Sequence, residues 1–205
     1  MDNLALPMSQ PRTPRPRAAA AVWIAGAVTY LGAEALSAAA FRPEYHYAHD
    51  YISDLGVPGQ PLAALMNVAF GVQGVSFLVG ALLARRHRAP LLVTFAAANA
   101  VGNVLVGTVH AGAGPLHVVG AALAIVGGNA AAIAGAGLRD GRTYRVTSRL
   151  LGTAGLVCTA ALVAQAWTGT QMLPAAVWER GAVYPILAWQ LVAAAALLPA
   201  RRQHT

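Results

Sequence analysis

Six apolar runs, each of about twenty residues, constrain the fold of this chain more than any other feature of its sequence. A helix of roughly 20 residues is what a hydrocarbon core of about 30 Å requires. Charged residues make up 10% of the chain, whereas a soluble domain carries about 25%. The sequence therefore predicts an all-α polytopic membrane protein, a bundle of six transmembrane helices. The predicted helices cover residues 18–40, 62–84, 90–111, 115–138, 150–173 and 181–200.

The distribution of arginine predicts the orientation of this bundle. Residues 1–17 are rich in Pro and Arg and predict a disordered cytoplasmic tail, and 201–205 form a second tail. Twelve of the fourteen Arg lie in these tails or in the breaks at 85–88 and 139–149. Because basic loops stay on the cytoplasmic side, we expect both termini inside a cell membrane and residues 41–61 outside.

Two alternatives concern the ends and the charge of the chain. A basic tail followed by an apolar run that ends in small residues also fits a cleaved signal peptide, so this alternative stays open for the first helix. A net charge of +7 would suggest nucleic-acid binding in a soluble protein. Here the arginines lie along one membrane face, so no nucleic-acid partner is predicted.

Several motifs of known chemistry do not occur in the sequence. It contains no P-loop, no GxSxG and no CxxC pair, so we predict no cofactor. Its one cysteine, Cys158, lies within an apolar run and can form no intrachain disulfide. The sequence does not determine the oligomeric state.

Titratable side chains gather at the predicted outer face. Glu34 lies inside the first apolar run, where an ionisable group costs on the order of 3 kcal/mol and normally has a partner or a function. It is either a catalytic acid or base, or a structural acid paired with Arg42 or Arg180. His110 and His117 bracket a short Gly/Pro hairpin, so both imidazoles are expected near the outer surface.

The stretch 41–61 carries a second group of such side chains. If it is helical, the spacing places four of them on one face: His46, His49, Asp50 and Asp54. Three interpretations remain open, namely a metal site, contact with a polar head group, and a solvated face. The metal interpretation is the weakest because no HExxH motif is present, and we predict no metal site.

Asparagines extend from the predicted outer face into the apolar runs. Asn99 and Asn103 continue inward from His110 on one helical stripe, and Asn67 and Asn129 add amides on two other helices. They form either a polar track into the bundle or a set of interhelical hydrogen bonds.

Some of these residues resemble the signature of a known family. Ile52-Ser53-Asp54-Leu55-Gly56, followed by Leu65-Met66-Asn67, is similar to the signature loop of domain-of-unknown-function family 998. Glu179-Arg180 with Tyr184 and Trp189-Gln190 resembles its actinobacterial members. The family more often has Glu where this chain has Asp54. The resemblance implies a six-helix fold, a distant similarity to proteins of lipid remodelling, and importance for Ser53, Asp54, Asn67 and His117, but no established activity.

These observations lead to two hypotheses about function. The first is an outward-facing polar pocket that binds an amphipathic lipid or isoprenoid and, if the protein is an enzyme, processes it by general acid/base chemistry. The second is a non-enzymatic small transporter or an assembly partner of an envelope complex. For the first, the catalytic candidates are Glu34, Asp54, His110 and His117. The substrate-binding candidates are His49, Asp50, Ser53, Asn67, Asn103 and Glu179.

Overall fold

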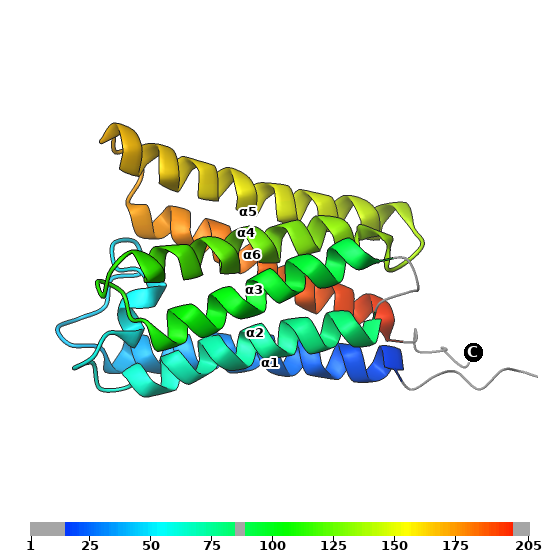
Figure 1. The fold of residues 1–205 in the computed structure, drawn as a ribbon, viewed down its shortest axis with the longest axis horizontal. Coiled ribbons are helices and arrows are strands. Elements are labelled where there is room, and N and C mark those ends of the chain that lie inside the picture. The colour runs from blue at the N-terminus through cyan, green and yellow to red at the C-terminus, as the bar shows by residue number, and fades with distance from the viewer. Residues whose placement is uncertain (1–14, 85–88, 199–205) are drawn as a thin grey trace, which may run out of the picture.

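The computed structural model describes residues 15–84 and 89–198. Within these residues it has six helices that are long and apolar enough to cross a membrane, which confirms the predicted six-helix fold (Figure 1). The helices are α1 (Arg15–Ala40), α2 (Ala63–Ala84), α3 (Pro90–Thr108), α4 (Pro115–Ala134), α5 (Arg142–Thr168) and α6 (Ala175–Leu197), and two short 3₁₀ helices are η1 (Ile52–Gly56) and η2 (Gly135–Gly137). The orientation in the membrane stays a prediction.

Five of the helices form a closed ring. α1 packs on α2, α2 on α3, α3 on α4, α4 on α6, and α6 returns to α1. α5 lies outside this ring against α4 and α6 (Figure 1). Small residues allow the closest approaches: a Cβ added to Gly102 would lie 2.2 Å from the backbone nitrogen of Ala124. The interior of the ring is therefore enclosed by α1, α2, α3, α4 and α6.

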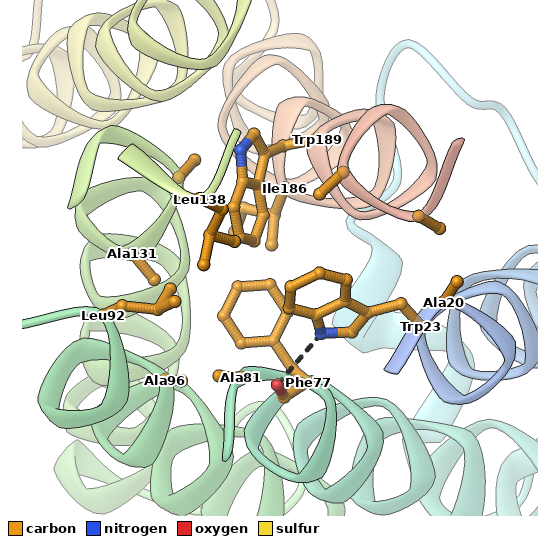
Figure 2. Packing of buried hydrophobic residues seen from close by; sticks show 13 residues of the cluster. Ala20, Trp23, Phe77, Ala81, Leu92, Ala96, Ala131, Leu138, Ile186 and Trp189 are labelled. Carbon is orange, nitrogen blue, oxygen red and sulfur yellow. Dashed lines mark hydrogen bonds between the residues drawn. The ribbon is translucent and has the colours of Figure 1, made fainter. Parts of the chain in front are cut away.

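One half of the ring interior is filled by aromatic side chains, which we call the Trp core and define by Trp23, Phe77 and Trp189 (Figure 2). The rings of Trp23 and Trp189 meet edge to face at a centroid distance of 5.3 Å. Trp23 Nε1 donates to the carbonyl oxygen of Phe77 at 3.1 Å, and Trp189 Nε1 donates to Ser148 Oγ at 3.2 Å. Both indoles are therefore buried with their donors satisfied.

The other end of the bundle carries the connection between α1 and α2, the α3–α4 hairpin and the α5–α6 turn (Figure 1). We call it the η1 end, because η1 lies in the first of these connections. The start of α1 and the end of α6 lie at the opposite end (Figure 1).

The last two helices differ from the predicted bounds. Residues 142–149 belong to α5 rather than to a basic loop, because Arg, Thr and Tyr are tolerated in a helix that extends past the apolar segment. α5 ends before Gly169, whose φ of +70° provides a left-handed C-cap. α6 begins at Ala175, directly after Pro174, so Trp178, Glu179 and Arg180 lie in its first turns and not before it.

Other predicted features lie partly outside the described residues. The break at 85–88 and the tail at 201–205 lie outside them, as do residues 1–14 of the first tail. Residues 15–17, which were assigned to that tail, are helical in α1. α3 ends at Thr108, three residues before its predicted end.

Candidate functional site

The connection between α1 and α2 folds over the η1 end as a closed loop. Its two ends are joined by paired bonds: the backbone N–H of Arg42 donates to Gln60 Oε1, and Gln60 Nε2 donates to the carbonyl of Arg42, both at 2.9 Å. Asn67 Nδ2 of α2 donates to the carbonyl of Gly56 at 2.9 Å. A Cβ at Gly56 would lie 2.1 Å from Asn67 Oδ1, so a larger residue there would displace the Asn67 amide. The loop is thus fastened to α2.

Acidic side chains shape the loop from within. Asp50 Oδ2 accepts from the backbone N–H of His46 at 2.6 Å, and Asp54 Oδ2 accepts from the backbone N–H of Tyr51 at 2.8 Å. The hydrogen bond of Asp54 lies at the N-terminus of η1, where a carboxylate satisfies an otherwise unpaired donor. Residues 46–50 form a turn and not a helix.

Two adjacent charged residues of α6 hold η1 in place. Glu179 Oε2 accepts from the backbone N–H of Ile52 at 2.6 Å. Arg180 Nη1 donates to the carbonyl of Asp50 at 2.8 Å, and Arg180 Nη2 donates to the hydroxyl of Tyr45. Burial raises the pKa of the Tyr45 hydroxyl above its usual value, so this phenol stays protonated and donates to the carbonyl of Tyr51 at 2.9 Å.

The same arginine links α6 to α1. Glu34 is 3% exposed, and its Oε1 lies 3.7 Å from Arg180 Nε. The hydroxyl of Tyr184 also donates to Glu34 Oε1, at 2.7 Å. Glu34 is therefore an ion-paired acid, and Arg180 is the partner among the two that the sequence suggested.

A cavity of about 50 Å³ lies inside the ring beneath η1. All five ring helices and η1 contribute to its wall, whereas α5 does not. Its apolar lining includes Tyr30, Phe70, Val106, Ile125, Ile186 and Leu187. Its polar lining comprises Ser53, Gln73, Asn99, Asn103, His117 and Glu179.

Most of the polar lining residues are hydrogen-bonded to the surrounding helices. Asn99 Nδ2 donates to the carbonyl of Ala124 at 2.6 Å, and Asn103 Nδ2 donates to the carbonyl of Asn99 at 2.9 Å. His117 Nδ1 lies 2.6 Å from the carbonyl of Val109. Since a carbonyl can only accept, His117 carries its proton on Nδ1, and in the neutral ring Nε2 is left as an acceptor.

Asp54 of η1 is a half-buried carboxyl beside the cavity. Removal from water raises its pKa above the usual value, and the nearby charge of Asp50 adds to this rise. The hydrogen bond from Tyr51 and the electrostatic effects of His117 and Arg180 act in the opposite direction. Among the described residues, no three His, Cys, Asp or Glu side chains come together in a way that could hold a metal ion.

A comparison with protein-family models matches residues 18–196 to the family described as protein of unknown function, DUF998. The chain belongs to this family. The match confirms the resemblance that was inferred from η1 and the start of α2. No curated protein and no solved structure matches the chain.

In this DUF998 member the predicted site residues fall into two groups. Ser53, Asn103, His117 and Glu179 line the cavity. The others lie around it: Glu34 in the ion pair, Asp54 in η1, Asp50 and Asn67 in the bonds that hold the loop, His49 exposed on the loop, and His110 bonded to the carbonyl of Ala111. The sequence predicted one shared face for His46, His49, Asp50 and Asp54 if this stretch were helical. Residues 46–50 form a turn instead, so these side chains do not share a helical face.

Two glutamines of the bundle interior were not predicted as site residues from the sequence. Gln73 of α2 is 3% exposed and donates through Nε2 to Gln190 Oε1 of α6. A signal was present, because a glutamine within an apolar run that spans a membrane needs a partner. What the sequence could not show is that Gln73 and Gln190 face each other across the ring.

Proposed function

We propose that this protein binds the polar end of a membrane amphiphile, a lipid or an isoprenoid, in the cavity beneath η1. The observation that carries the proposal is a cavity with six polar lining side chains inside an otherwise apolar membrane bundle. Polar groups at such depth are costly and mark ligand sites more often than packing. The apolar part of the lining suits the chain of the amphiphile and the polar part its end group.

If the protein is an enzyme, we propose that it processes the bound ligand by acid/base chemistry. His117 supplies an Nε2 that can accept a proton from the ligand, and Asp54, in η1 beside the cavity, supplies a carboxyl whose pKa is raised by burial. Glu34 and Arg180 position η1 over the cavity. If the ligand is processed, Asp54→Asn and His117→Ala should each abolish its conversion without lowering the yield of folded protein. Equal loss of folded protein in both variants would show that these residues have a structural role instead.

The binding proposal is tested by filling the cavity. Ala121 lines the cavity, and its neighbour Ala122 faces outward on the same helix. We expect Ala121→Phe to remove an amphiphile that co-purifies in mild detergent with the wild-type protein at a fixed ratio, and Ala122→Phe to retain it. Mass spectrometry of extracted lipid measures both ratios. Equal lipid content in wild type, Ala121→Phe and Ala122→Phe would refute the proposal.

We further propose that the protein lies in the cell membrane with both termini in the cytoplasm and the η1 end outside. The arginine distribution supports this orientation. A reporter inserted after Gly59, which is exposed in this loop, should be active only on the outer side. Cytoplasmic activity of that reporter would reverse the orientation.

A further inference from the structure

Three side chains of the cavity lining offer acceptors to a ligand. Asn99, Asn103 and His117 each direct a nitrogen at a backbone carbonyl of the bundle. Because those partners can only accept, the orientation of both amides and the tautomer of the imidazole are determined. These residues therefore leave two amide oxygens and the imidazole Nε2, all acceptors, whereas the lining hydroxyls of Ser53 and Tyr30 can donate or accept.

One of these acceptors is both buried and unused. Asn99 is 2% exposed, and its Oδ1 accepts no hydrogen bond from any residue that the structure describes. A buried polar atom without a partner costs free energy, so native proteins retain few of them. A ligand that donates a hydrogen bond would remove this cost.

The charged side chain of the cavity also favours a ligand that donates hydrogen bonds. Glu179 is the charged residue among the described lining residues, and one of its oxygens already accepts from Ile52. Arg180, the neighbouring cation, is directed at Asp50, Tyr45 and Glu34 instead. An anionic end group would therefore lie near a carboxylate and several acceptors, with the hydroxyls of Ser53 and Tyr30 as donors, whereas a hydrogen-bond donor could bond to the acceptors and to either hydroxyl.

The size of the cavity allows more than one small polar group. Its volume of about 50 Å³ is the space open to the centres of water-sized spheres, and about 10–15 Å³ of such space is enough for one water molecule. The selectivity of the cavity therefore depends on its hydrogen-bonding groups and not on its size.

We infer that the cavity is selective for a hydrogen-bond-donating end group, a primary ammonium or a hydroxyl, on an otherwise apolar chain. The inference rests on the proposed function and names the ligand class of the same site. The donor bonds to Asn99 Oδ1, Asn103 Oδ1 and His117 Nε2, and the chain follows the apolar part of the lining. His117 is then the group that accepts a proton from the ligand.

The test uses four probes with the same six-carbon chain. Hexylammonium and 1-hexanol donate hydrogen bonds, whereas hexanoate and hexyltrimethylammonium do not. The full-length protein is placed in phosphatidylcholine nanodiscs, whose lipid head group carries neither an ammonium N–H nor a hydroxyl. The shift of the unfolding temperature with probe concentration yields each apparent dissociation constant.

We expect saturable binding of the two donors and at least about tenfold weaker binding of the two others, the ratio that corresponds to one lost hydrogen bond. Asn103→Ala should weaken donor binding about tenfold relative to wild type. Asn129→Ala is the matched control, because Asn129 is an equally buried amide that does not line the cavity. Each variant is compared with its own probe-free unfolding temperature, which separates binding from stability.

The possible failures are distinguishable. Binding of hexanoate or hexyltrimethylammonium as tight as that of hexylammonium, and weakened by Asn103→Ala, would overturn the donor selectivity and leave the proposed binding function standing. Donor binding that Asn103→Ala and Asn129→Ala affect equally would overturn the assignment to this cavity. Absence of binding by all four probes, together with unchanged lipid content in Ala121→Phe, would overturn both proposals.

Discussion

The two ends of the ring interior are built on different physical principles. In the Trp core both indole donors are satisfied and apolar rings fill the space. At the η1 end, Glu34 and Arg180 are buried, Asn99 Oδ1 has no partner among the described residues, and a cavity remains. A membrane protein gains nothing in stability from an unfilled polar cavity. The difference therefore indicates that the Trp core maintains the fold, and it supports the proposal that the η1 end binds a ligand.

The largest expected effect on stability lies in the Trp core. Trp189 is fully buried, so Trp189→Ala should lower the free energy of unfolding by about 3–5 kcal/mol through lost contacts and a new cavity. Denaturant titration in mixed micelles measures this change. Trp167→Ala is the matched control, because Trp167 is 90% exposed and should matter little. A small effect of Trp189→Ala would contradict the structural role of the Trp core.

A smaller effect is expected where α6 holds η1. Arg180→Leu leaves Glu34 buried without its partner and removes the hydrogen bond to Asp50, at a cost of about 3 kcal/mol. The double variant Glu34→Leu with Arg180→Leu should recover part of this loss, because no buried charge is then left unpaired. The same titration compares the single and double variants. If the double variant is less stable than Arg180→Leu, the pair does not act as a coupled unit.

The smallest expected effect concerns pH. Burial raises the pKa of Asp54 in the folded state, so the protonated carboxyl is favoured there, and this contribution to stability is lost as pH rises through the raised pKa. Asp54→Asn should therefore gain stability relative to wild type as pH increases from about 4 to 8. Unfolding temperatures across this range measure the difference.

A substitution of an exposed carboxyl controls for general charge effects on this pH dependence. Glu44→Gln is suitable, because Glu44 lies in the same loop and is exposed to solvent. A difference between Asp54→Asn and wild type that is constant with pH, or that Glu44→Gln reproduces, would contradict the burial of Asp54.

The sequence predicted the helices better than the site because the two depend on different information. Apolar length alone determines that a segment spans a membrane, so six helices could be expected. The positions of Glu179 and Arg180 were misjudged, because charged residues near the start of an apolar run can be either a loop or the first turn of a helix. Their hydrogen bonds to the backbone of Ile52 and Asp50 join segments more than a hundred residues apart, and periodicity carries no information about such contacts.

The sequence predicted where the candidate site lies but not which side chains pair within it. A concentration of acids and imidazoles at one end is visible in the sequence, and Asn103 and His117 do line the cavity. The role of Glu34 required the structure, because only the packing of α1 on α6 shows that Arg180 is its partner. Gln73 was missed because its partner, Gln190, lies on a helix distant in the sequence.

Photochemical labelling from inside the cavity tests the central claim most directly. A diazirine analogue of leucine at position 187 lies in the cavity lining, because Leu187 lines the cavity and is 3% exposed, whereas the same side chain at position 101 faces lipid, because Val101 is 54% exposed. After irradiation in native membranes, we expect a single amphiphile species attached at position 187 and the mixture of bulk lipids attached at position 101. The same lipid mixture at both positions, or no adduct at position 187, would contradict the claim that the cavity beneath η1 binds a specific membrane ligand.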